Sequence, residues 1–304
     1  MDSSISVQFM KTLLLAACLI GLGASFSPAA ESLSQRYSPY GDLILTQMVT
    51  APFPHPARAE GHRYQDKFFP AEKHYHDSSV ALFVPKGFKA GEAIDVVVHF
   101  HGWNGRLENV LAHYKLVEQF VASGKNAILI IPQGPLEASD SFGGKLEDAD
   151  GFKRFMAEAM GILKRRGLVT GDHVGSIILS GHSGGYHVMA SILAQGGLTE
   201  RVKEVYLFDA LYGQTEKFTN WFKTTNGKLI DLYTANGGTK VETEKLVSDL
   251  KRNQVKLWSG EESEGTDLSK SRLIFIYTSL EHDDVVEKHQ HFREFLKASC
   301  LGER

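Results

Sequence analysis

The sequence predicts an α/β fold with a central, mostly parallel sheet flanked by helices on both faces. Short continuous apolar runs alternate with amphipathic segments from about residue 78 onward, which is the pattern of buried parallel strands joined by crossover helices. The length also fits, because 304 residues, 42% of them hydrophobic and 23% charged, suit one large domain of this class. We find no internal repeat or low-complexity linker in the sequence that would mark a second domain.

Seven strands are predicted from the apolar runs, and these are Ser79–Val84, Ile94–Phe100, Ala127–Ile131, Ser176–Ser180, Glu204–Phe208, Leu229–Thr234 and Arg272–Thr278. Apolar residues at helical spacing predict helices between them. One helix starts at Leu107 and stops at Gly124, a second ends at Gly167, a third follows Ser183, and a last one runs from Val285 to about Ala298. Residues 31–75, rich in Pro, His and aromatic side chains, are predicted to be irregular, with one or two early strands.

The first 30 residues predict a secretory signal peptide. Lys11 precedes an apolar run from Leu13 to Leu22 that is too short to span a bilayer, and small residues follow it. We expect cleavage after residue 29 or 30, export to the periplasm or the medium, and no stable membrane span in the mature chain. A lipid anchor on Cys18 is the minor alternative, because apolar residues rather than polar ones follow that cysteine.

The predicted organisation is thus a signal peptide at residues 1–30, a wrapping segment at 31–77 and a main domain at 78–304. A net charge of −3 without a basic stripe gives no sign of nucleic-acid binding. Once the signal peptide is removed, Cys300 is the one cysteine left in the sequence, so stability is expected to come from the core and not from an internal disulfide. No pattern in the sequence determines the oligomeric state.

The sequence Gly181-His182-Ser183-Gly184-Gly185 is the first motif that carries chemistry. It follows a predicted strand and precedes a predicted helix, and in that setting small flanking residues permit a sharp, strained turn that exposes the serine. The helix N-terminus then directs backbone N–H groups and its dipole toward developing negative charge. Ser183 is therefore the predicted nucleophile.

A second motif, His99-Phe100-His101-Gly102-Trp103-Asn104-Gly105, also follows a predicted strand. A glycine-containing loop in this position can present a backbone N–H beside the nucleophile, so the N–H groups of Trp103 and Gly184 form the predicted oxyanion hole. Two alternatives stay open: the glycines only make a tight turn, or His99 and His101 bind a metal. We predict no metal, because no further ligand cluster follows at a recognisable spacing.

His282 is the predicted general base. It stands between the last predicted strand and the final helix, a loop position from which a histidine can reach the serine. His289 is an alternative, but we expect it within the final helix and facing solvent. The side chain of His182, next to the nucleophile, is expected to point away from it.

Asp209 is the predicted acid, since it follows the predicted strand that ends at Phe208 and would hold the tautomer of His282. Asp283 and Asp284 are exposed alternatives. Asp231 lies in the middle of a predicted strand and is badly placed for this role.

The order Ser183, Asp209, His282 resembles the chain order of the α/β-hydrolase family, and the resemblance covers about residues 78 to 298. Members of the family commonly carry the acid after the strand that here ends near Asn236, so Asp209 lies one strand earlier, which is a known variation. The resemblance implies a Ser-His-Asp triad, an acyl-enzyme intermediate, and neither a metal nor an organic cofactor.

Three aromatic residues near the motif loops, Trp103, Tyr186 and Tyr212, are predicted to line a substrate pocket. No long apolar insertion of the kind that forms a lipase lid lies between the motifs. The sequence therefore predicts a secreted carboxylesterase for small-molecule or polymer esters with short or medium acyl groups. A serine peptidase or amidase of the same fold, and a secreted binding protein that has lost catalysis, are the alternatives.

Overall fold

The computed structural model describes residues 28–263 and 266–304. The predicted signal peptide and Cys18 lie outside the described residues, apart from residues 28–30, which begin the first helix. Nine strands form the main sheet, and a separate hairpin is made by His62–Tyr64 (β2) and Lys67–Phe69 (β3). The strands of the main sheet are Gly41–Gln47 (β1), Ser79–Pro85 (β4), Ala93–Phe100 (β5), Ile128–Pro132 (β6), His173–His182 (β7), Val202–Phe208 (β8), Lys228–Thr234 (β9), Trp258–Glu261 (β10) and Leu273–Thr278 (β11).

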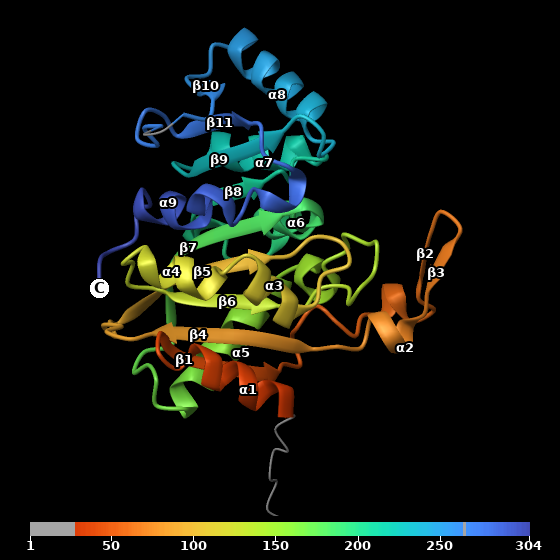
Figure 1. Ribbon diagram of the computed structural model, residues 1–304, viewed down its shortest axis with the longest axis vertical. Coiled ribbons are helices and arrows are strands. Elements are labelled where there is room, and N and C mark those ends of the chain that lie inside the picture. The colour runs from red at the N-terminus through yellow and green to blue at the C-terminus, as the bar shows by residue number, and fades with distance from the viewer. Residues whose placement is uncertain (1–27, 264–265) are drawn as a thin grey trace, which may run out of the picture.

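The strand order of this sheet is β1-β4-β6-β5-β7-β8-β9-β11-β10 (Figure 1). Strand β4 pairs antiparallel with both β1 and β6, and the pairs from β6 to β10 are parallel. Each of the seven predicted strands is present in the sheet. The predicted α/β class with a mostly parallel sheet is therefore confirmed.

Helices cover both faces of the sheet (Figure 1). One face is covered by Pro28–Tyr37 (α1), Leu107–His113 (α3), Leu116–Ala122 (α4) and His291–Lys297 (α9). The other is covered by Gly151–Arg165 (α5), Tyr186–Gln195 (α6), Thr215–Thr224 (α7) and Lys240–Arg252 (α8), while a short helix, Ala71–His74 (α2), lies beside the β2–β3 hairpin. No helix within the described ranges is long and apolar enough to cross a bilayer.

Strand β5 shows why the predicted strands are continuous apolar runs. Val96 and Val98 pack on the face covered by α5 and α6, whereas Val97 packs on the face covered by α3 and α4. Successive side chains of a strand point to opposite faces, and both faces are buried under helices here. The polar alternation of a half-exposed sheet is therefore not seen.

Three boundaries differ from the predictions. The helix predicted from Leu107 is divided at Lys115, whose φ of +48° interrupts it. The last helix begins at His291 and not at Val285, because His289 and Gln290 both have a φ of +55°. The prediction that His289 lies within this helix is therefore wrong.

The N-terminal segment contains more regular structure than predicted: α1, β1, the β2–β3 hairpin and α2 all lie within or just before residues 31–77. Beyond β1, the segment leaves the main sheet and builds a small apolar cluster of its own from Phe53, Phe69 and Tyr75 with Ala138. Ala138 lies in the loop after β6. This cluster thus attaches the segment to a loop at the same edge of the sheet as Ser183.

Candidate active site

The predicted catalytic residues lie where the parallel strands end. Ser183 follows β7, Asp209 follows β8, and His282 begins a short 3₁₀ helix that comes soon after β11. Strands β7, β8, β9 and β11 are successive neighbours in the sheet, so loops that are far apart in sequence lie together at their carboxyl ends. Ligands of open α/β sheets bind at this edge.

Ser183 occupies a strained turn between β7 and α6. Its φ is +53°, a left-handed conformation that costs a non-glycine residue about 1–3 kcal/mol unless its surroundings enforce it. The flanking positions have no room for side chains. A Cβ on Gly181 would lie 2.4 Å from Met189 Sδ, and one on Gly185 would lie 2.6 Å from the Phe100 carbonyl oxygen. The two glycines therefore permit the turn that presents the half-buried Ser183 side chain.

Asp209 and His282 are paired directly. His282 Nδ1 lies 2.7 Å from Asp209 Oδ2, and because an ionised carboxylate can only accept, Nδ1 carries the proton. Nε2 of the neutral ring then keeps its lone pair. The Asp209 side chain is fully buried, whereas that of His282 is 28% exposed, so the ring projects from a buried anion toward accessible space.

The Asp209 carboxylate is surrounded by donors. Thr234 donates its hydroxyl to Oδ2 at 2.7 Å and its N–H to Oδ1 at 3.2 Å, and the Thr239 hydroxyl also donates to Oδ1. The backbone of Gly237 also packs against the carboxylate, and only glycine fits there because a Cβ would lie 1.6 Å from Oδ2. Burial raises the pKa of Asp209, but the hydrogen bonds from His282, Thr239 and Thr234 outweigh it and hold the pKa below its ordinary value. Asp209 is thus kept ionised.

The alternative acids lie elsewhere or make other contacts. Asp231 is buried within β9, and Asp284 forms an ion pair with Lys288 at 2.6 Å. Asp283 lies close to His282, but the imidazole donates its Nδ1–H to Asp209.

The side chain of His182 supports the main chain of His282. His182 Nε2 lies 2.9 Å from the His282 carbonyl oxygen and therefore donates to it, so Nδ1 accepts from the Tyr114 hydroxyl, also at 2.9 Å. Burial, followed by the charge of His282, lowers the pKa of His182 to about 4. This neutral histidine connects the α3–α4 junction to the segment that carries the candidate base.

The loop after β5 lies against the Ser183 turn. A Cβ on Gly102 would lie 2.6 Å from Ser183 Cβ, and a Cβ on Gly184 would lie 2.8 Å from Trp103 Cδ1. Glycine at these two positions therefore lets the backbones approach closely, and the predicted oxyanion-hole residues Trp103 and Gly184 lie side by side.

His101 fixes this loop in place. Its Nε2 accepts the Gly134 N–H at 2.9 Å, so Nδ1 carries the proton and donates to the Gly102 carbonyl at 2.7 Å. Burial lowers the pKa of His101. Both of its ring nitrogens are engaged, and His99 Nδ1 instead lies 2.9 Å from Ser180 Oγ. These two histidines are thus not arranged to share a metal.

Tyr212, predicted to contact substrate, also contacts the candidate nucleophile. Its hydroxyl donates to the Gly237 carbonyl, and its pKa is raised to about 12 by burial and then by the charge of Asp209, against the effect of a hydrogen bond with Ser183. The Tyr212 ring also lies 6.3 Å from that of His282 and 5.9 Å from that of Tyr186.

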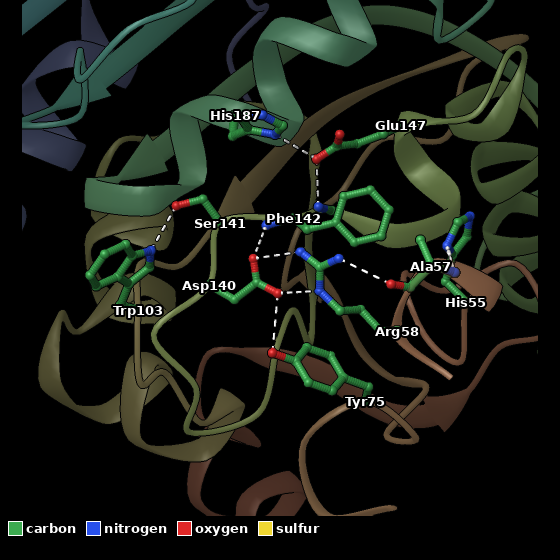
Figure 2. Close-up of polar contacts among 11 residues, drawn as sticks. His55, Ala57, Arg58, Tyr75, Trp103, Asp140, Ser141, Phe142, Glu147 and His187 are labelled. Carbon is green, nitrogen blue, oxygen red and sulfur yellow. Dashed lines mark hydrogen bonds and ion pairs between the residues drawn. The ribbon is translucent and has the colours of Figure 1, made fainter. Parts of the chain in front are cut away.

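The N-terminal segment supports the site in a way that the motifs did not predict (Figure 2). Arg58 holds Asp140 through two hydrogen bonds of 2.7 and 3.1 Å, and the Tyr75 hydroxyl adds a third of 3.1 Å. Next to Asp140, Ser141 Oγ accepts from the Trp103 indole at 2.7 Å. Arg58 and Asp140 are 82 residues apart, so no local pattern could reveal their contact.

Comparisons with known proteins agree with this architecture. No known family profile and no curated protein matches the sequence. Among solved structures, a feruloyl esterase module from Clostridium thermocellum, complexed with sinapinate, aligns with a TM-score of 0.52 at 9% identity, covering 87% of this chain and 91% of that one. A ferulic acid esterase aligns with a TM-score of 0.50 at 13% identity, covering 72% and 90%. The chain has the α/β-hydrolase fold, as its motifs predicted.

Proposed function

We propose that this protein is a serine hydrolase that cleaves carboxylic esters, with Ser183 as nucleophile, His282 as general base and Asp209 as the acid of the triad. The observation that carries the proposal is the 2.7 Å hydrogen bond between His282 Nδ1 and the fully buried Asp209, at the edge of the sheet where Ser183 lies in a strained turn. An ionised carboxylate that fixes one imidazole tautomer is the arrangement that a histidine base requires.

In the proposed mechanism, Ser183 gives its hydroxyl proton to His282 Nε2 as Oγ attacks the ester carbonyl carbon. Asp209 stabilises the imidazolium that forms, and the N–H groups of Trp103 and Gly184 receive the oxyanion. Collapse of the tetrahedral intermediate expels the alcohol, which takes a proton from His282, and leaves an acyl group on Ser183. Water, deprotonated by His282, then releases the carboxylic acid and restores the serine.

The space beside the proposed oxyanion hole favours short acyl groups. A cavity of about 20 Å³ lies between the loop of residues 140–143 and the turn at Gly184, with Phe142 and Val188 in its wall. A single water occupies roughly 10–15 Å³ on this scale, so we propose that this space admits an acyl group as small as acetyl. Trp103, which is 40% exposed, is proposed to contact the alcohol part of the ester. Tyr186 and Tyr212 are the other residues proposed to contact the substrate.

Hydrolysis of p-nitrophenyl esters by the purified mature chain tests this function. Rates should fall from acetate through butyrate to octanoate, and p-nitrophenyl ferulate tests the substrate class suggested by the feruloyl esterase neighbours. Ser183→Ala should lower kcat by on the order of 10⁶-fold and abolish labelling by a fluorophosphonate. Ser248→Ala, which changes an exposed serine of α8, is the matched control and should keep both.

Two results would redirect the proposal. Faster cleavage of an amide than of the matched ester would identify a peptidase or amidase. Inertness toward every activated ester, together with absence of fluorophosphonate labelling, would identify a binding protein that keeps the fold without the activity.

We also propose that residues 1–30 export the protein, on the evidence of the charged start, short apolar run and small residues of that segment. N-terminal sequencing of the protein secreted by its host should find cleavage after residue 29 or 30. A mature chain that begins with a lipidated Cys18 would contradict this cleavage site.

A further inference from the structure

A second group of titratable side chains lies apart from Ser183, at the end of the sheet formed by β10 and β11. Glu262 directly follows β10, His291 is the first residue of α9, and His289 lies two residues before it. Glu262 Oε1 lies 2.6 Å from His289 Nδ1 and 2.7 Å from His291 Nε2. The side chains are 20%, 61% and 8% exposed in that order, so the group is buried on the His291 side and open on the His289 side.

The contacts of His291 require a positive species between it and Glu262. Its Nδ1 lies 2.9 Å from the Val285 carbonyl oxygen, and because a carbonyl can only accept, Nδ1 carries the proton of the neutral ring. Nε2 of that ring then presents a lone pair to a carboxylate oxygen 2.7 Å away. Two acceptors at this distance repel each other unless a second proton or a metal cation lies between them.

The surroundings hold Glu262 and His291 as metal ligands are held. Glu262 Oε2 accepts from the Thr278 hydroxyl at 2.5 Å, while the Val285 carbonyl orients the His291 ring. Histidine ligands commonly donate their other ring nitrogen to a backbone carbonyl, and carboxylate ligands are in turn hydrogen-bonded. A cavity of about 1300 Å³, whose wall includes all three residues, gives access from solvent.

We propose that Glu262, His289 and His291 bind a divalent transition-metal ion of the Zn²⁺ type, with water as a further ligand. Two imidazoles and one carboxylate are a common protein ligand set for zinc with one open position. Zinc–nitrogen bonds of about 2.0–2.1 Å require both contacts of Glu262, to His289 and to His291, to open by several tenths of an ångström. The exposed His289 side chain can rotate, and the partly exposed Glu262 carboxylate must shift away from the buried His291 ring.

The metal would stabilise the segment that follows the candidate base. It would join the end of β10 to the start of α9, and His282 lies between β11 and that helix. The site does not touch Ser183, His282 or Asp209 in the described residues. Binding should therefore raise the thermal stability of the protein without being needed for ester hydrolysis.

Metal binding is measured on the full mature chain, free of any polyhistidine tag. After treatment with a chelator, we expect one Zn²⁺ to bind per chain by calorimetry, Co²⁺ to give visible d–d absorption bands, and Zn²⁺ to raise the Tm. His289→Ala and Glu262→Gln should each weaken Zn²⁺ binding by more than the roughly 10–100-fold that loss of a supporting partner costs. Thr278→Val removes only such a partner and should fall within that range.

The matched control is His173→Ala. The side chain of His173 is 80% exposed, and this residue is far in sequence from Glu262, His289 and His291. The variant should bind Zn²⁺ as the parent does. Circular dichroism shows whether each variant is folded. Absence of Zn²⁺ binding by the parent would mean that only a proton lies between His291 and Glu262, and it would overturn the proposal. Binding that survives in His289→Ala but is lost in His282→Ala would also overturn it, since the ion would then sit at the group formed by His182, His282 and Asp283.

Discussion

Two buried aspartates, Asp209 just past the end of β8 and Asp231 within the neighbouring strand β9, have pKa values shifted in opposite directions. Both side chains are 0% exposed. Asp209, just past the end of β8, has hydrogen bonds to both oxygens and a pKa below its ordinary value. Asp231, inside β9, receives one hydrogen bond from Thr243 at 2.8 Å, and its Oδ1 has no partner among the described residues. Burial, only partly offset by that bond, raises its pKa to about 7.

The difference teaches that donors and not depth decide the charge of a carboxyl in this sheet. A strand interior offers a side chain few donors, because its backbone N–H groups are used by the neighbouring strands. The end of a strand exposes unused N–H groups and lets a following loop add hydroxyls, as Thr234 and Thr239 do for Asp209. A carboxylate that must stay ionised while buried therefore belongs at the strand end.

The largest expected effect comes from removing the charge of Asp209. Asp209→Asn keeps the shape of the side chain but lets the amide donate to His282, which then presents the wrong tautomer to Ser183, so kcat for p-nitrophenyl acetate should fall by on the order of 10⁴. Asp231→Asn is the matched control and should leave kcat unchanged, since Asp231 does not contact His282. Near-normal activity in Asp209→Asn would show that another carboxylate, such as the nearby Asp283, supports the base.

The fold was predictable because each central strand is buried on both faces and so appears in the sequence as an apolar run. Strand β10, Trp258–Glu261, was missed because it is a short edge strand with one large apolar residue. The early strand β1 was only loosely anticipated. Its residues pair with β4 at the other edge, a long-range contact without a local signature.

The parts of the candidate site that depend on a local turn, the Ser183 motif and the loop of residues 99–105, could be proposed from the sequence alone. The supporting groups were not. Thr239, His101 and Arg58 act through partners that are 30 or more residues away, and a threonine or an arginine in a loop looks the same with or without such a partner. The contact of Glu262 with His291 spans 29 residues, and for the same reason no metal site was predicted there.

The next largest effect is on stability as a function of pH. The folded pKa of Asp231, about 7, lies above the ordinary value of 3.8, so the folded state binds the proton more tightly than the unfolded chain does. The contribution of Asp231 to the free energy of unfolding is fully present below pH 3.8 and is lost as the pH rises toward 7. The loss is about 1.4 kcal/mol per pH unit and on the order of 4 kcal/mol over the whole range. Urea unfolding from pH 4.5 to 7.5 should therefore show a flatter free-energy profile for Asp231→Asn than for the parent.

Asp209 should act in the opposite direction. Its folded pKa lies below its ordinary value, so it contributes stability above pH 3.8 that is lost as the pH falls through the folded pKa. Asp209→Asn should therefore leave the profile between pH 4.5 and 7.5 close to parallel to that of the parent, apart from the small change made by loss of the Asp209 charge, which contributes to the raised pKa of Asp231. Parallel profiles for Asp231→Asn as well would mean that Asp231 is ionised in the folded protein, and the comparison of the two aspartates would fail.

The smallest expected effects come from removing the hydroxyls that donate to these carboxyls, Thr239 to Asp209 and Thr243 to Asp231. A hydrogen bond to an ionised group is worth about 1.5–3 kcal/mol and one to a neutral group about 0.5–1.5 kcal/mol. At pH 6, Thr239→Val should accordingly lower the free energy of unfolding more than Thr243→Val does. It should also lower kcat, because Asp209 loses a donor that keeps it ionised and oriented toward His282, whereas Thr243→Val should leave kcat unchanged. Equal losses of stability in the two variants would contradict the view that Asp209 is charged and Asp231 neutral, since the two hydroxyls would then be bonded to carboxyls of the same kind.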